Sequence, residues 1–180
     1  MPAPIDLPRH PVFFGHPLHA ILSDLPAALI PVALVSETAR MLRPSSRTRF
    51  LSDAASIAAL TAGLAAAAAG WLDWLTMPTE HPAQKPATLH GLINSGAVLS
   101  TFGAVMKPSR RIAWLGLATA CVAVGGWIGG DLVFRLGWRV RPAEEAELVE
   151  TKLREAGLGV YFDTARAEVD EFERTRTFTG

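Results

Sequence analysis

The sequence predicts an all-α integral membrane protein, a four-helix up-down bundle followed by an extramembrane helical tail. The chain has 180 residues, of which 49% are hydrophobic. Four apolar runs each approach the roughly 20 residues that a helix needs to cross the hydrocarbon core of a bilayer. A soluble protein of this size would have nothing left to cover four helices that are apolar all round. The runs cover about residues 18–40, 53–76, 89–106 and 112–133.

These runs divide the chain into an N-terminal segment (1–17), a transmembrane domain (18–141) and a tail (142–180). The N-terminal segment lacks the basic region and the small-residue cleavage site of a signal peptide. The first helix contains Pro26 and Pro31, which should bend it because each removes a backbone hydrogen bond. The second helix is rich in alanine, and the fourth carries closely spaced glycines.

The distribution of basic residues predicts the orientation. The two turns within the hairpins hold seven Lys and Arg residues, and the opposite side of the membrane holds five. Basic residues collect on the cytoplasmic side of a membrane. We therefore expect a multi-pass protein of the inner (plasma) membrane, with both termini on the outer, periplasmic side.

Polar residues gather on that outer side, because helices one and three begin there and helices two and four end there. Ionisable groups at membrane depth are costly and mark candidate sites. His16 and His19 open the first helix, with His16 at its cap, while His90 and Asn94 open the third and Asp73 closes the second.

These residues support two kinds of cofactor site. A b-type haem requires imidazoles that approach the iron from opposite sides, so His16 or His19 could pair with His90, with Asn94 beside them. A transition metal could instead bind His16, His19, His90 and Asp73, because imidazole and carboxylate suit zinc, copper, iron or nickel. The alternative is that the histidines are only interfacial polar residues.

The remaining intramembrane charges have simpler interpretations. Asp131 can pair with Arg135 one turn later, Asp24 can pair with a neighbouring helix, and Glu37 can pair with Arg40. Small residues let membrane helices approach closely, and the fourth helix carries two such pairs, which are Gly125 with Gly129 and Gly126 with Gly130. The tryptophans at the ends of helices two and four either anchor the protein in the interface or form the wall of an aromatic pocket.

Four segments carry a family resemblance, namely GHPLHAILSDLPAAL, GWLDWL, HGLINSGAVL and GGDLVFRLGWRV. Together they resemble the membrane family filed as domain of unknown function 2231, over residues 15–141. The resemblance implies a four-helix membrane module. Because some members occur with Rieske iron–sulfur domains, it also implies a redox setting. The polar signature of that family falls on His16, His19, Asp73, His90, Asn94, Gly129, Gly130 and Arg135, and Asp131 stands where many members have Glu.

The tail is acidic, with five basic and ten acidic residues over 143–180. Pro142 favours a helix start and Gly157 favours a helix end. This charge disfavours nucleic acid and anionic lipid as partners of the tail.

From the histidine cluster and the family resemblance, we expect a haem- or metal-binding protein in an electron-transfer setting. The alternative is a non-catalytic accessory subunit that joins a larger membrane complex through the tail or the glycine faces. Neither interpretation requires a stand-alone enzyme.

Overall fold

The computed structural model describes residues 12–14, 16–138 and 140–175, and four long helices dominate it. They are α1 (Leu18–Leu42), α2 (Ser46–Leu75), α3 (Gln84–Met106) and α4 (Arg111–Phe134), with a 3₁₀ turn, η1 (Pro108–Arg110), before α4. All four spans, with η1 included in the last, are long and apolar enough to cross a membrane. The all-α fold class is therefore confirmed.

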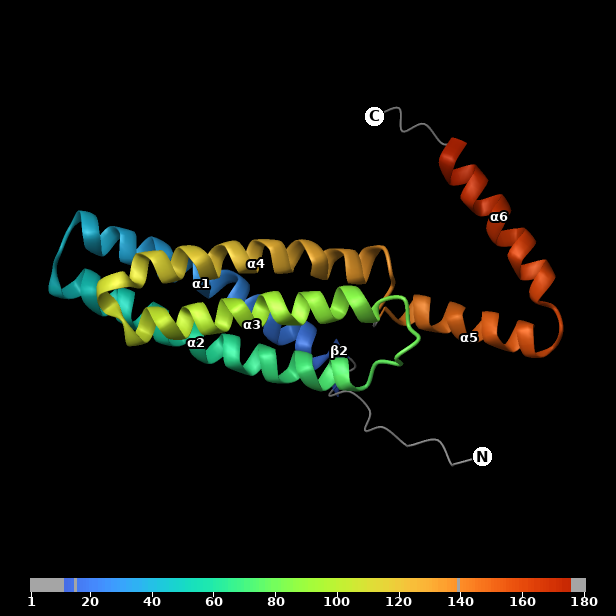
Figure 1. The fold of residues 1–180 in the computed structure, drawn as a ribbon, viewed down its shortest axis with the longest axis horizontal. Helices are drawn as coiled ribbons and strands as arrows, with labels where there is room; N and C mark the ends of the chain where they lie inside the picture. Colours follow the sequence, from blue (N-terminus) through green and yellow to red (C-terminus); the bar gives the residue numbers. More distant parts are fainter. Residues whose placement is uncertain (1–11, 15, 139, 176–180) are drawn as a thin grey trace. The chain divides into compact units, whose positions relative to one another are not determined.

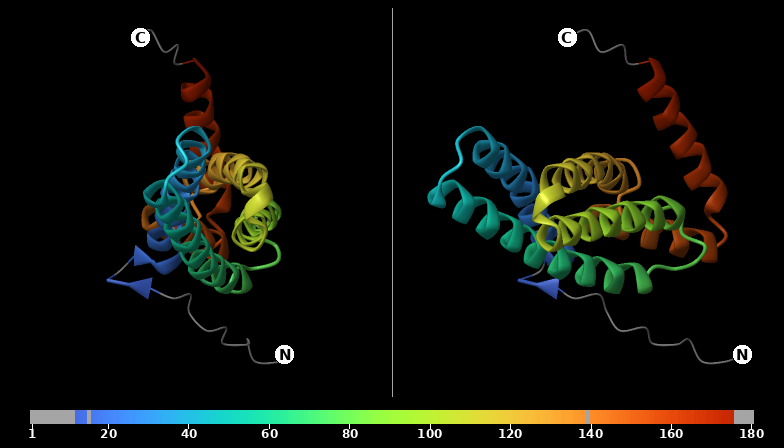
Figure 2. Two further views of the ribbon diagram at one scale, coloured as in Figure 1. Left: turned by 90° about the vertical axis from the view of Figure 1, so that its left-hand side faces the viewer. Right: turned by 60° about the vertical axis from the view of Figure 1, so that its left-hand side comes forward.

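The four helices run alternately up and down (Figure 1). Each packs chiefly against its neighbours in the ring order α1, α2, α3, α4, so α1 and α3 are diagonal partners. The end view in Figure 2 shows this arrangement. As a result, the first turns of α1 and α3 and the last turns of α2 and α4 share one end, here called the polar end. The α1–α2 and α3–α4 connections share the other, here called the turn end.

Small side chains fill the centre of the bundle, and large ones cover its outside. Among the described residues, the central buried cluster consists of five alanines together with Ile30 and Leu115. Large apolar residues such as Phe50, Leu99 and Val35 are more than 60% exposed. This pattern suits a lipid solvent, in which close backbone approach, rather than burial of large side chains, drives helix association.

Two helices begin earlier than the hydropathy pattern indicates. α2 starts at Ser46, because Ser45 and Thr48 form a capping box in which each side chain bonds the other residue's backbone N–H. α3 starts at Gln84, several residues before the apolar run. Both helices therefore extend beyond their apolar segments.

A short β-hairpin precedes α1. Strand β1 (Val12–Phe13) pairs antiparallel with strand β2 (His16–Pro17), with Phe13 opposite His16. Pro17 is the N-cap of α1, so His16 lies outside the helix rather than at its cap, where the sequence placed it.

The chain divides into two compact units, 1–136 and 137–180. The second unit contains α5 (Arg141–Glu155) and α6 (Gly159–Thr175). Gly157 ends α5 with φ +75°, and the amide of Leu158 donates to the carbonyl of Leu153 at 2.8 Å. This is the Schellman arrangement, in which a left-handed residue closes the last helical turn. Arg154 then links α5 to α6 through Asp163 (Nη2–Oδ1 2.6 Å).

Candidate functional site

Two imidazoles meet inside the polar end. His19 projects from the first turn of α1 and His90 from the second turn of α3, so they approach from diagonal helices. Their ring centroids are 6.1 Å apart, and the ring planes are almost perpendicular, at 83°. Both side chains are partly buried.

A backbone carbonyl fixes the orientation of each ring. His19 Nδ1 lies 3.0 Å from the carbonyl oxygen of Ala66 on α2. His90 Nδ1 lies 2.9 Å from the carbonyl oxygen of Gly125 on α4. A carbonyl can only accept, so Nδ1 carries the proton in each neutral ring and Nε2 carries the lone pair. Metal-binding histidines commonly have this second interaction, because it fixes the tautomer and the ring orientation.

A glycine leaves room for each ring. A Cβ atom at Gly70 would lie 2.8 Å from the His19 ring, and one at Gly129 would lie 2.9 Å from the His90 ring. A third glycine, Gly125, faces the amide of Asn94 in the same way. Any larger residue at these positions would push the polar side chains out of place.

The His19 and His90 sites repeat one structural unit. In both, a histidine near the start of one helix bonds a carbonyl of the next helix, and the glycine beside the ring follows four residues later. The pairs on the second helix are Ala66 with Gly70 and Gly125 with Gly129. The two hairpins thus supply matching halves, and the imidazoles meet between them.

Asn94 completes the cluster from α3. Its Nδ2 lies 3.1 Å from His90 Nε2, one helical turn along the same face. The same Nδ2 lies 3.3 Å from His90 Nδ1, so the amide sits beside both ring nitrogens. Asn94 therefore packs against the His90 ring from one helical turn away.

The other predicted site residues are placed differently. His16 is exposed in β2, and Asp24 is exposed on α1. Asp73 is 8% exposed near the end of α2. Asp131 pairs with Arg135 through Oδ2 and Nη2 at 2.5 Å. Among the described residues, no three His, Cys, Asp or Glu side chains are grouped as metal ligands.

Of the four predicted packing glycines on α4, only one pair lies against a neighbouring helix. Gly125 and Gly129 contact α3 side chains, whereas a Cβ at Gly126 would meet nothing within 4 Å. At Gly130 the nearest atom belongs to Phe134 of the same helix.

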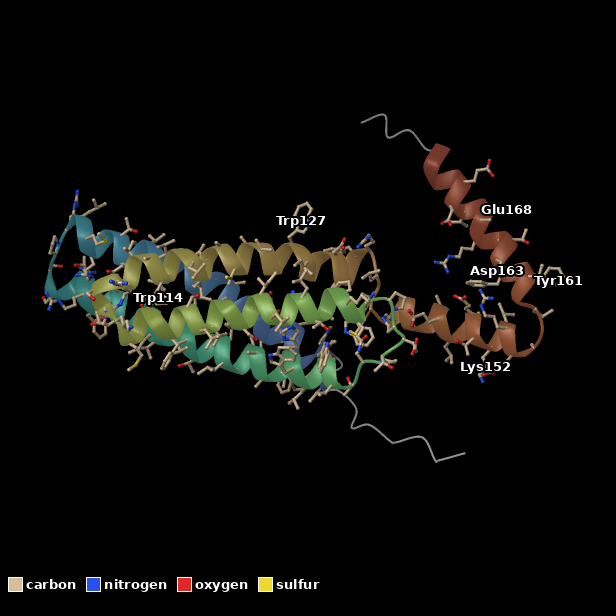
Figure 3. All side chains as sticks on the ribbon, in the orientation of Figure 1. Trp114, Trp127, Lys152, Tyr161, Asp163 and Glu168 are labelled. Atoms are coloured by element: carbon tan, nitrogen blue, oxygen red, sulfur yellow. The ribbon has the colours of Figure 1, made fainter. Side chains whose placement is uncertain are left out.

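Two tryptophans at the end of α2 are directed toward α3. Trp71 Nε1 donates to Ser95 Oγ (3.1 Å) and its ring lies over Gly91, while Trp74 Nε1 donates to Thr88 Oγ1 (2.9 Å). Trp127, by contrast, is 82% exposed and points away from the bundle in Figure 3. The α2 tryptophans thus pack on α3, and Trp127 faces the surroundings.

The turn end contains a buried ion network, of which the sequence predicted only the Glu37–Arg40 pair. Glu37 on α1, 1% exposed, accepts from Arg40 Nε and from Ser52 Oγ on α2, both at 2.7 Å. Arg111 on α4 donates to Asp53 Oδ1 at 2.5 Å and to Ser52 Oγ at 3.1 Å.

Arg111 also donates to the carbonyl of Ala104 on α3 at 3.2 Å, so the network joins all four helices. In the sequence, Arg111 is one of the seven basic residues of the two hairpin turns, and nothing more was predicted for it. Its position at the first residue of a transmembrane helix, opposite a membrane-depth glutamate, was the available signal.

The fold and these two ends define a multi-span helical membrane protein with a paired-histidine cluster at one end and an ion network at the other. The chain belongs to the family described as "Predicted membrane protein (DUF2231)", whose sequence profile matches residues 15–142. The family resemblance noted in the sequence is thereby confirmed. No curated protein and no solved structure matches the chain.

Proposed function

We propose that this membrane protein binds a b-type haem through His19 and His90 and takes part in electron transfer. The observation that carries the proposal is the pair of imidazoles, which come from diagonal helices, lie 6.1 Å apart and are each bonded through Nδ1 to a carbonyl. His19 and His90 would hold the haem iron through their Nε2 atoms.

The two histidine rings and the small residues beside them are the groups that would hold the haem. The small residues at Ala66, Gly70, Gly125 and Gly129 let the polar side chains of the cluster lie directly against α2 and α4. A bound haem would supply one-electron redox chemistry.

The protein's own groups would prepare the ligands. The carbonyls of Ala66 and Gly125 hold Nδ1 protonated, which makes Nε2 the electron-pair donor. The Asn94 amide lies against the His90 ring and would help to hold its orientation. A transition metal held by His16, His19, His90 and Asp73 is less well supported, because His16 is exposed in β2.

A second candidate function is that of an accessory subunit in a larger membrane complex. Two glycines of α4 favour the accessory-subunit function. In the described part of the chain, Gly126 and Gly130 have no neighbouring helix against them, so they leave a strip without side chains on α4 next to the exposed Trp127. Such a strip could receive a helix of a partner. The acidic tail is the second surface that a partner could use.

The proposed location is the inner membrane, with the polar end and both termini outside. The basic turn end supports this orientation by the positive-inside rule. In that arrangement the histidines lie near the periplasmic surface, where a periplasmic redox partner could exchange electrons with the haem.

An absorbance spectrum tests the haem proposal. The full chain, purified in mild detergent from haem-sufficient cells, should show a Soret band and a reduced-minus-oxidised difference spectrum. His19→Ala and His90→Ala should each abolish the band, whereas His16→Ala, a histidine outside the pair, should keep it. Metal analysis of the same sample separates haem iron from another metal.

A colourless wild-type protein would refute the haem proposal. If it also contained no metal and co-purified with a defined membrane partner, the accessory-subunit function would replace it. In that case both His19→Ala and His90→Ala should still bind the partner.

A further inference from the structure

The turn end carries a strong positive charge on its surface. Residues 37–53 and 107–111 contain seven basic and two acidic side chains. The two acids, Glu37 and Asp53, are both engaged in the ion network with Arg40 and Arg111. Five basic side chains remain exposed, and none has an ion pair among the described residues. We call them the basic rim: Arg43, Arg47, Arg49, Lys107 and Arg110.

Apolar side chains border this basic rim. Leu42 is 77% exposed, Phe50 is 69% exposed and Met106 is 61% exposed. These residues lie at the ends of α1 and α3 and at the start of α2, where the candidate spans meet the headgroup region. A ligand at the rim therefore meets cations and exposed apolar surface together.

A shallow groove lies at one side of the rim. It has a volume of about 400 Å³ and is lined by Ser46, Arg49, Phe50 and Asp53. The Asp53 carboxylate accepts from Arg111, which offsets its repulsion of an anion. The Ser46 hydroxyl and the Arg49 guanidinium can donate to a phosphate, and the Phe50 ring offers an apolar contact beside them.

We propose that the basic rim binds anionic phospholipid headgroups, with the groove at Arg49 receiving one of them. Charge complementarity supports this partner, because basic residues beside a membrane attract anionic lipids. The exposed apolar border favours a lipid over a free phosphate ion, because acyl chains can cover Leu42 and Phe50. The surface is independent of the histidine cluster, which lies at the other end of the bundle.

Lipid co-purification tests this proposal. The full chain is reconstituted in nanodiscs of equal parts phosphatidylcholine and phosphatidylglycerol, re-extracted in mild detergent and analysed for bound lipid by mass spectrometry. The wild type should retain more phosphatidylglycerol than phosphatidylcholine. Each basic residue near the surface is worth about fivefold in association. Replacing Arg47, Arg49 and Arg110 together by Gln should therefore lower the enrichment by up to about a hundredfold.

Two matched variants control for folding and net charge. The same three positions changed to Lys should keep the enrichment, since the charge remains. Gln at Lys152, Arg154 and Arg166, which removes three charges from the tail, should also keep it. Inorganic phosphate in excess should leave the bound lipid unchanged.

Equal retention of both lipids by the wild type would overturn the proposal. So would undiminished enrichment in the rim Gln variant, or an equal loss in the tail variant. Displacement of the lipid by inorganic phosphate would show that the rim recognises free anions instead.

Discussion

At the scale of single residues, the glycines beside the histidines give the sharpest expectation. Gly129→Ala places a methyl group 2.9 Å from the His90 ring, so the ring or the helix must shift. Gly126→Ala, three residues earlier, meets open space. Alanine exceeds glycine in helix propensity by about 1 kcal/mol. We expect Gly129→Ala to lower the thermal unfolding temperature in detergent and Gly126→Ala to leave it equal or higher.

The same comparison applies to the first hairpin. A methyl group at Gly70 would lie 2.8 Å from the His19 ring, so Gly70→Ala should destabilise the protein as Gly129→Ala does. If Gly129→Ala and Gly126→Ala unfolded at the same temperature, this would contradict the conclusion that the His90 ring leaves no room for a methyl group at position 129.

The ion network at the turn end supplies a second expectation. Glu37→Ala leaves Arg111 without part of its buried anionic environment, and loss of one partner in a buried pair costs about 3–5 kcal/mol. Asp131→Ala removes the carboxylate of a more exposed pair, which is worth at most about 1 kcal/mol. The free energies of unfolding of the two variants, measured in mixed micelles, give the two costs for comparison. Equal stability would show that the network contributes no more than a surface pair.

Sequence spacing predicted the pairs that lie on one helix. Glu37 with Arg40 and Asp131 with Arg135 stand one turn apart, so their side chains share a face. Sequence spacing could not predict which carbonyl groups bond the histidines. Every residue has a backbone carbonyl, so the residue type does not show which one accepts the bond. The glycine four residues later was the one visible trace of each contact.

At the scale of helices, hydropathy located the spans but not their ends. Residues 46–52 begin α2 although they include two arginines, because a capping box satisfies the first backbone amides and the helix extends into a polar region. Hydropathy records the part of a helix that meets lipid, while hydrogen bonding determines where the helix begins. His16 was misplaced for a related reason, because the chain pairs as a hairpin up to Pro17.

The end of α5 gives an expectation at this scale. Gly157 has φ +75°, which costs a residue with a Cβ roughly 1–2 kcal/mol. Gly157→Ala should therefore weaken the bond from the Leu158 amide to Leu153, and hydrogen exchange at Leu158 should become faster. Gly157→Asn is the matched control, since asparagine tolerates the left-handed region. Equal exchange in the Ala variant and the wild type would contradict this role.

At the scale of the whole molecule, the bundle consists of two similar hairpins. α1 packs most extensively on α2, and α3 on α4, and each hairpin supplies one histidine together with its carbonyl and glycine. Sequence reasoning found the histidines but not this repetition, because the flanking residues of the two hairpins differ.

The repetition predicts that the chain tolerates a cut between its halves. Residues 1–80 and 81–180, co-expressed as separate chains, should co-purify in mild detergent, because the break falls in the α2–α3 connection and leaves both hairpins intact. A cut after Pro44 divides the first hairpin and should reduce recovery of the complex. Equal recovery from the two cuts would argue against the hairpin as the unit of assembly.

The basic turn end also determines how the protein responds to an electric field. Each elementary charge that crosses a membrane against its potential costs about 2.3 kcal/mol per 100 mV. Seven basic and two acidic residues give this end a net charge of five, so moving this end alone across the membrane would cost about 11.5 kcal/mol per 100 mV. An energised membrane would therefore hold the bundle in one orientation after insertion, with the turn end on the electrically negative side.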